Sequence, residues 1–196
     1  MLSSGEILAA RVTGALEINP YSETQMKDAS YVLRLGSCFR RWLAADAPIR
    51  LWSPDAATEA LAAPETAEAL RIEPGHLVLG CTLERIRLGA GLAGQISPLS
   101  HVARFGLGVT CGADFINPGF GNSIPSSLTL ELFNHNVRPL ELRAGMPVAH
   151  LRLLKITRTD ERPPRRSIYE GADPLTDPLL YEEWSVALRA TMQEKP

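Results

Sequence analysis

The sequence predicts a mainly β protein, folded as a sandwich or a barrel, and two of its features support this class. Short apolar segments with strand-like alternation recur between residues 70 and 156, and turn-forming residues separate them roughly every ten positions. A chain that alternates strands with helices would instead carry amphipathic helical patterns between its strands. The length of 196 residues fits one domain with appendages. We therefore expect a single β domain with a short helix at each end.

The N-terminal segment predicts one helix followed by two strands. Ser3 or Ser4 precedes a run of apolar residues, a pattern typical of a capped helix. Residues 16–18 are typical of a short strand and residues 31–36 of a second one. Residues 37–42 either continue that second strand or pair back against it. Both outcomes keep this segment inside the β domain.

The rest of the chain divides by composition. Residues 44–70 are rich in Ala, Pro, Asp and Glu, which predicts a surface insertion with one helical turn near residues 57–61. Residues 158–178 are polar and proline-rich, and residues 178–188 are typical of an amphipathic helix. We expect a β domain over residues 1–157, with 44–70 inserted, and a C-terminal segment over 158–196. The remaining strands are expected at residues 70–72, 77–87, 93–96, 106–110, 128–134, 140–142 and 148–156.

Composition narrows the class of partner. The net charge of −2 argues against a protein that coats nucleic acid, whereas small anionic ligands remain compatible with it. Cys38, Cys81 and Cys111 are isolated among small or apolar residues, so we expect buried, reduced thiols. The N-terminus lacks the pattern of a signal peptide, and no run of about 18 apolar residues occurs. The sequence therefore predicts a cytoplasmic protein with no membrane partner.

One acid stands out. In the strand expected at residues 128–134, alternation places Leu128, Leu130 and Leu132 on one face and Glu131 on the other, together with Phe133. The many apolar residues around it indicate that both faces are at least partly covered. A covered carboxylate needs hydrogen-bond partners or a changed pKa. Glu131 is therefore the leading candidate for a chemical role.

Other motifs favour plain structure. Residues 89–94 match the glycine pattern of a dinucleotide-binding loop, but Pro98 follows too soon for the helix which that site needs. The spacing of Cys and His fits no metal site, and no nucleophile-elbow glycines flank Ser100. On composition alone, residues 98–106 are most simply a capped helical turn with a surface arginine, and residues 117–119 a β-turn.

Taken together, the segments resemble the dCTP deaminase branch of the trimeric dUTPase superfamily. The resemblance extends from Met1 to about Thr176, and its motifs are weak singly but strong in this order and spacing. They are Leu2-Ser3, Ile7-Leu8, Leu33-Arg34-Leu35-Gly36, Ile72-Glu73-Pro74-Gly75, Thr82-Leu83-Glu84, residues 100–107, Ile116-Asn117-Pro118-Gly119-Phe120, residues 128–134 and Ala144-Gly145-Met146-Pro147-Val148.

The resemblance implies a distorted jelly-roll β-barrel that assembles as a homotrimer, with active sites between subunits. It also implies hydrolytic deamination of dCTP, or a related cytosine nucleotide, to dUTP and ammonia without a protein-bound metal. Mg²⁺ would arrive on the triphosphate of the nucleotide. In this reading Glu131 takes a proton from the water that attacks C4 of cytosine, and Ser100 and Arg104 hold that water and the developing charge.

The resemblance further implies a set of substrate-binding residues. Ala113 matches the residue whose backbone packs on the base, and Tyr169 and Gly171 fit a lid segment that folds over the nucleotide. His101 and Asn117 complete the expected set. By itself the polar tail around residues 169–171 would be expected to be disordered.

Several positions differ from the family pattern, and most of them are binding positions. Leu99 stands where the family usually has a phosphate-gripping arginine, and loss of one charge-assisted contact of about 1.5–3 kcal/mol weakens binding by roughly tenfold or more. The other changes are Val32 and Asn117 in place of acids, Asp114 in place of a histidine or other polar residue, Ala172 in place of glutamine, and four extra residues between Gly119 and Glu131. Two alternatives therefore stand beside the deaminase: a noncatalytic trimer that binds a nucleotide or a protein partner, and, less favoured, a dUTP diphosphatase.

Overall fold

The computed structural model describes residues 1–157, 169 and 171–193. Its helices are α1 (Ser4–Val12), the 3-10 turn η1 (Glu23–Gln25), α2 (Ala56–Ala60), α3 (Ser100–Arg104) and α4 (Leu180–Gln193). Its strands are β1 (Leu16–Asn19), β2 (Met26–Lys27), β3 (Ser30–Arg41), β4 (Glu65–Thr66), β5 (Ala69–Ile72), β6 (Leu77–Leu88), β7 (Leu92–Pro98), β8 (Leu107–Gly108), β9 (Phe115–Ile116), β10 (Ser126–Asn134), β11 (Leu140–Arg143) and β12 (Pro147–Lys155). The predicted mainly β fold is confirmed.

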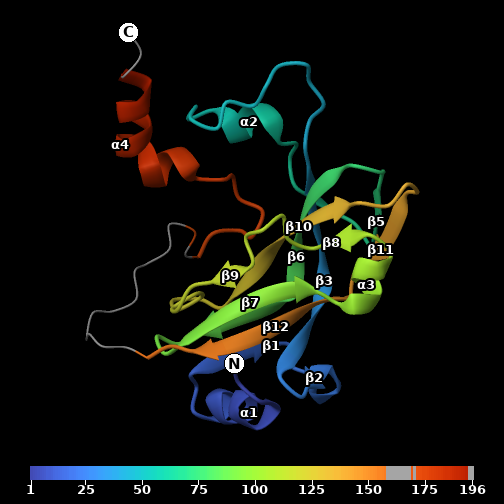
Figure 1. The fold of residues 1–196 in the computed structure, drawn as a ribbon, viewed down its shortest axis with the longest axis vertical. Helices are drawn as coiled ribbons and strands as arrows, with labels where there is room; N and C mark the ends of the chain where they lie inside the picture. The colour runs from blue at the N-terminus through green and yellow to red at the C-terminus, as the bar shows by residue number, and fades with distance from the viewer. Residues whose placement is uncertain (158–168, 170, 194–196) are drawn as a thin grey trace.

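One curled antiparallel sheet forms the body of the molecule (Figure 1). Its strands follow the order β8-β10-β6-β3-β12-β7-β9, with β1 paired to β6 and with β2 and β4 paired to β3; β5 and β11 form a separate pair. The long strand β3 joins the two halves, because Leu33 pairs with Ala149 of β12 whereas Phe39 pairs with Gly80 of β6. Between Leu35 and Phe39 the register shifts, so the sheet turns at this strand. Residues 37–41 therefore continue β3 rather than folding back, and Trp42 forms an isolated bridge with Leu61.

Alternating side chains along the strands build the core. On β10, Leu128, Leu130 and Leu132 are buried, while Thr129 is exposed and Glu131 half-buried. This is the alternation predicted for the strand, and burying one apolar row fixes the register because a one-residue slip would reverse the two faces. We call the face of β10, β6 and β3 that carries Glu131 the outer face.

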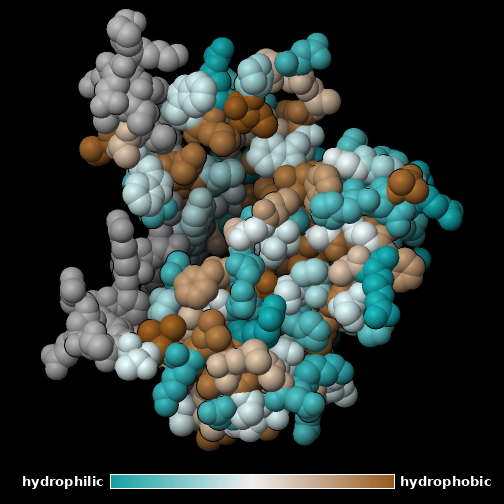
Figure 2. All heavy atoms as spheres, in the orientation of Figure 1, coloured by the Kyte–Doolittle hydropathy of each residue, from teal (hydrophilic) through white to brown (hydrophobic). Residues whose placement is uncertain are grey.

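The helices attach to the rim of the sheet. Ser3 caps α1 in a capping box with Glu6, as the sequence predicts. The predicted helical turn in the insertion is α2, and the Trp42–Leu61 bridge returns this excursion to the sheet. Figure 1 shows α2 and α4 at one end of the molecule and α1 at the other. Figure 2 shows apolar surface near α2, where Leu43, Ile49 and Leu51 are exposed.

Some local predictions are wrong. The strand expected at residues 106–110 is reduced to β8, because the chain turns into a loop after Gly108. All three cysteines are free, but only Cys81 is buried; Cys38 is half-buried, and Cys111 is exposed because it lies in that loop. Residues 158–168 of the expected C-terminal segment lie outside the described residues, so the boundary at 157/158 stays a prediction. Within the described part of the chain, no helix has the length and apolar character needed to span a membrane.

Candidate functional site

Glu131 lies near the middle of β10 with its carboxylate on the outer face. The strand places it opposite Leu79 of β6, and its own backbone N–H donates to the carbonyl of Val109. The Cys111 backbone N–H donates to Oε2 of Glu131 at 2.5 Å. Among the described residues, Oε1 accepts no hydrogen bond. One oxygen is therefore fixed by the protein, and the other can accept a proton or bind a water molecule.

The loop from Val109 to Asp114 runs beside Glu131 and forms one wall of the candidate site. Partial desolvation of the thiol, although the residue as a whole is exposed, and secondly the Glu131 carboxylate raise the pKa of the Cys111 thiol above its ordinary value. Ala113 follows two residues later and is exposed. Gln95 of β7 donates to Asp114 Oδ2 at 2.7 Å, which ties the end of the loop to the sheet. This loop is therefore held at both ends, and its backbone lies next to the carboxylate.

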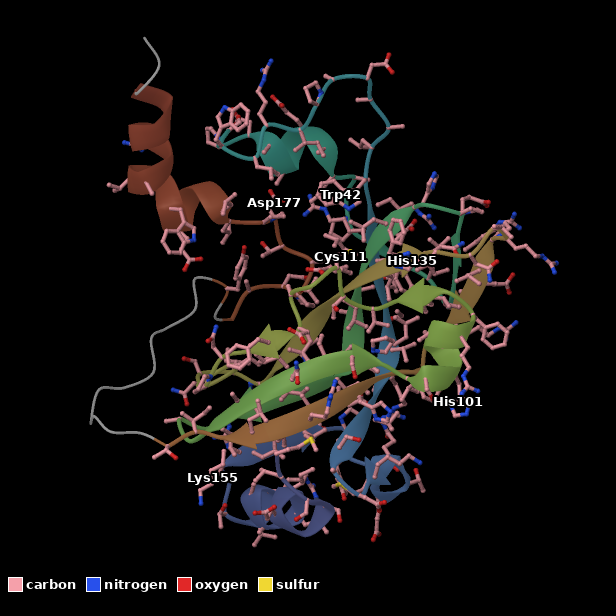
Figure 3. All side chains as sticks on the ribbon, in the orientation of Figure 1. Trp42, His101, Cys111, His135, Lys155 and Asp177 are labelled. Carbon is pink, nitrogen blue, oxygen red and sulfur yellow. The ribbon has the colours of Figure 1, made fainter. Side chains whose placement is uncertain are left out.

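The residues expected on the helical turn are grouped on α3, away from Glu131. Ser100, His101 and Arg104 are exposed, and Leu99 rather than a serine occupies the N-cap position. Figure 3 shows His101 on α3 well apart from Cys111, the hydrogen-bond partner of Glu131. Within one chain, no hydrogen bond or ion pair among the described residues joins a side chain of α3 to Glu131. The predicted serine, arginine and acid therefore form two separate parts.

The turn at Asn117 has the local structure that the sequence predicts. The Phe120 N–H donates to the Asn117 carbonyl at 3.2 Å, and Gly119 has φ +85°, as a type II turn requires. Asn117 is exposed. The Phe120 carbonyl then accepts from the Leu88 N–H at 2.8 Å, which fixes the turn against the end of β6.

Tyr169 and Gly171 begin a segment that returns to the outer face. Ala172 N–H donates to the Tyr169 carbonyl at 3.0 Å, and the Tyr169 hydroxyl accepts from Leu179 N–H at 2.7 Å. The disorder expected at these two residues from composition alone is therefore not what the structure shows. The Thr129 hydroxyl, two residues from Glu131 on the same face, donates to the carbonyl of Pro174. We call residues 171–179 the C-terminal strap.

Two contributors to this region were missed from the sequence. The Cys111 amide that binds Glu131 carries no side-chain pattern, so only its position before Ala113 could have indicated it. Arg40 of β3 also reaches the strap, where its Nη1 donates to the Leu175 carbonyl at 3.0 Å. The alternation of β3 indicates which face Arg40 occupies, but the partner lies 135 residues away and has no sequence signal.

Comparison with known proteins gives a consistent result. A family model described as dCTP deaminase-like matches residues 1–156. A relative from Parafrankia sp. (strain EAN1pec) named "dCTP deaminase, dUMP-forming" is 34% identical over 205 residues, covering 100% of this chain and 96% of the relative. A relative of the same name from Mycolicibacterium vanbaalenii is 35% identical over 168 residues, covering 83% of this chain and 84% of that protein.

A solved structure supports the fold. The 2'-deoxycytidine 5'-triphosphate deaminase from Agrobacterium tumefaciens matches with a TM-score of 0.58 at 21% identity and covers 78% of this chain. The match covers 47% of that solved chain, so this chain spans about half its length. The predicted distorted jelly-roll barrel of the dUTPase-like type is confirmed as the fold.

Proposed function

Because the chain belongs to the dCTP deaminase-like family, we propose that it deaminates dCTP by hydrolysis, with Glu131 as the general base. The observation that carries this proposal is the Glu131 carboxylate, half-buried on the outer face with Oε2 held by the Cys111 N–H. A base held in this way keeps its second oxygen aimed in one direction. A positioned general base contributes roughly 10²–10⁴-fold to rate.

The chemical step follows from that geometry. Oε1 takes a proton from water as the oxygen of that water attacks C4 of the cytosine ring. Glu131 passes this proton to the exocyclic amino group, the C4–N bond breaks and ammonia leaves, and the second proton of the water ends on ring N3 as the C4 carbonyl forms. In this proposal the backbone of the loop at Ala113 packs against the cytosine ring. Ala113 is exposed and therefore accessible to a ligand.

A second copy of the chain completes the site in this proposal. Ser100 and Arg104 are exposed on α3, and within one chain neither makes a hydrogen bond or an ion pair with Glu131. A guanidinium and a hydroxyl are suited to holding a reacting water and the negative charge that develops on it. We therefore propose a homotrimer in which α3 of one subunit faces Glu131 of its neighbour, with His101 and Asn117 at the nucleotide.

The triphosphate brings the metal in this proposal. Within the described residues no three His, Cys, Asp or Glu side chains gather in one place. A Mg²⁺ ion would therefore take its ligands from phosphate oxygens and water, as this ion commonly does. Its role is to neutralise phosphate charge, and the deamination step is assigned to the chain's own residues.

The product is the finer part of the proposal. The sequence predicts dUTP, whereas the relatives from Parafrankia and Mycolicibacterium are named as dUMP-forming. At this similarity over nearly the whole chain, we propose that the deaminated nucleotide is hydrolysed further to dUMP and pyrophosphate. The diphosphatase activity is then the second step of one reaction rather than a competing function.

A product assay tests both steps. Purified protein with dCTP and Mg²⁺ should release ammonia, and Glu131→Gln should lower that rate by roughly 10²–10⁴-fold. Glu141→Gln is the matched control, because Glu141 is an exposed acid on β11, which pairs with β5 outside the sheet that carries Glu131. Pyrophosphate measured in the same reaction separates dUMP from dUTP. Equal ammonia release by Glu131→Gln and wild type would refute the assignment of the base.

One alternative remains specific enough to test. Leu99 and Ala172 replace residues expected to bind the nucleotide, which favours a noncatalytic trimer if no cytosine nucleotide reacts. Titration of dCTP, dCMP, CTP and dUTP by calorimetry separates the two cases. Binding without ammonia or pyrophosphate release would support the noncatalytic protein.

A further inference from the structure

The C-terminal strap is docked on its own chain by a buried arginine. Arg40 is only 9% exposed, and its Nε donates to the Ala62 carbonyl at 2.6 Å. Its Nη1 donates to the Leu175 carbonyl at 3.0 Å and to Asp177 Oδ1 at 2.5 Å. A buried guanidinium needs acceptors for its N–H groups. The strap supplies two of these acceptors. If the strap left, two N–H groups of the buried Arg40 side chain would lose their partners.

An apolar contact holds the same part of the strap. Leu175 is 1% exposed and packs in a small cluster that is separate from the main core. The other members come from the excursion, from β6 and from the end of β3; they are Ala57, Leu61, Leu79, Cys38 and Trp42. Figure 3 shows Trp42 and Asp177 in the same region, between α2 and β10. The insertion with α2 thus forms part of the surface on which the strap packs.

The dock is linked to Glu131 through one row of the sheet. Arg40 of β3 pairs with Leu79 of β6, and Leu79 pairs with Glu131 of β10. Side chains directly opposite each other in such ladders have Cβ atoms about 4.5–5.5 Å apart. Leu175 belongs to the same apolar cluster as Leu79, the middle member of this row, and the Pro174 carbonyl accepts from the hydroxyl of Thr129, two residues from Glu131. The strap therefore lies on the outer face, bonded to the strand that carries Glu131.

The docked strap also forms a wall of a pocket. Residues 171–174 face Arg85, Ser126 and Ser127 across a space of about 220 Å³. The pocket combines a guanidinium, two hydroxyls and the Asp173 carboxylate, so it offers both donors and acceptors. Asp173 is itself engaged, since its Oδ1 accepts from Leu175 N–H at 2.8 Å. Undocking Leu175 would remove this wall.

We propose that Arg40 and Leu175 are positioning residues that keep the strap docked before the nucleotide arrives, so that the nucleotide meets a wall already formed. This inference rests on the proposed function, because it assigns the docked strap to nucleotide binding. A segment ordered in advance does not lose its conformational freedom on binding. Undocking therefore weakens nucleotide binding and leaves the bond-making step at Glu131 unchanged.

Variants of the strap test the proposal without altering the barrel. Leu175→Ser and Asp177→Ala should each speed hydrogen exchange in a peptide covering residues 171–179 and raise KM for dCTP by about tenfold, with kcat within about twofold. Leu175→Met, which keeps the apolar volume, should restore both values. Leu180→Ala is the matched control, because Leu180 is 41% exposed at the start of α4.

Two neighbouring arginines at the end of β3 provide a test variant and its control. Arg40→Ala should reproduce the exchange and KM changes of Leu175→Ser. Arg41→Ala should not, because Arg41 makes an ion pair with Glu65 in which both side chains are about half exposed (45% and 48%). The far-ultraviolet circular dichroism of each variant confirms that the sheet has formed.

Each outcome tests one part of the proposal. Unchanged hydrogen exchange of residues 171–179 in Leu175→Ser would show that Leu175 does not hold the strap on the barrel. Faster exchange with unchanged KM overturns the positioning role, as does a kcat that falls while KM stays constant. If wild-type protein releases no ammonia, the proposed function fails by itself, and the dissociation constant for dCTP takes the place of KM. Absence of nucleotide binding would then also overturn the positioning role, while exchange still reports on the dock.

Discussion

Glu84 provides the sharpest test of what holds the two halves of the sheet together. Its carboxylate is fully buried on β6 and accepts three hydrogen bonds. Oε1 accepts from Arg34 Nε at 2.7 Å and from Gln25 Nε2 at 3.0 Å, and Oε2 accepts from the Arg34 backbone N–H at 2.8 Å. Arg34 lies on β3 just before its register shift, so a side chain takes the donor that the ladder leaves unpaired there.

Glu84→Gln removes the charge and leaves only one acceptor oxygen for these three donors. If that oxygen keeps the two donors of Oε1, the new NH₂ group faces the Arg34 N–H, so a buried donor loses its partner at a cost of about 1–3 kcal/mol. Loss of the buried ion pair leaves the Arg34 guanidinium without its counter-charge, and breaking such pairs costs about 3–5 kcal/mol in total. Because the Arg34 side chain is 28% exposed, water compensates in part, and we expect about 3 kcal/mol.

Urea denaturation followed by circular dichroism measures this loss at fixed protein concentration. Glu73→Gln is the matched control, because its ion pair with Arg71 is largely exposed, with side-chain exposures of 46% and 64%. It should change the free energy of unfolding by less than about 1 kcal/mol. If Glu84→Gln and Glu73→Gln lower stability equally, the buried carboxylate does not join the two halves of the sheet and the reasoning is refuted.

Two further predictions concern Gly121, which follows the turn at residues 117–120, and the proposed general base Glu131. Gly121→Ala should destabilise the protein by at least about 2 kcal/mol in the same denaturation assay, because Gly121 has φ +66° and an added Cβ would lie 2.2 Å from the Ile86 carbonyl oxygen. Gly91→Ala, where no atom lies within 4 Å of the added Cβ, should stay within about 1 kcal/mol of wild type. Glu131→Gln should speed alkylation of Cys111 by iodoacetamide near neutral pH, because the carboxylate helps to raise the pKa of that thiol and the thiolate is the reactive form. Peptide mass spectrometry follows that reaction, and an equal rate in both proteins would argue that the Glu131 carboxylate does not act on Cys111.

Periodicity was enough to predict most of the fold because burial enforces it. The alternation of β10 follows directly from Leu128, Leu130 and Leu132, and the capped helix α1 follows from Ser3. The two-residue strand β9 was missed because its pairing with Gly94 and Gln95 of β7 depends on tertiary neighbours. Short strands of this kind carry no period to detect.

The candidate site was predictable only in part, for a related reason. Glu131 could be found because an acid breaks the apolar pattern of its strand. Cys111 contributes a backbone amide, and Arg40 binds a segment far along the chain, so neither has a local signature. Alternation could show which face Arg40 occupies, whereas the strap that needs it could be identified only from the fold.

The structure also separates the departures from the family pattern by where they lie. Val32 is 5% exposed and pairs with His150 of β12, in the half of the sheet away from β10, and its carbonyl accepts from Gln25 Nε2 at 2.6 Å. An acid at position 32 would therefore lie in the region of the Glu84 cluster, which is structural in this chain. The lack of an acid at position 32 therefore concerns the contact between β3 and β6 more directly than it concerns the carboxylate of Glu131. For this reason Val32 does not favour a noncatalytic protein.

Leu99 and Ala172 bear on nucleotide binding, because both lie next to groups of the proposed site. Leu99 is the N-cap of α3, and its N–H donates to the Val148 carbonyl at 3.0 Å, so it fixes the helix to the sheet but offers no side-chain donor to a phosphate. Ala172 lines the pocket beside Arg85. Positions 99 and 172 thus lack the polar side chains that the family pattern has there, while the Glu131 carboxylate and its backbone partner Cys111 are in place. Weak nucleotide affinity with a preserved deamination step is the combination that this distribution favours.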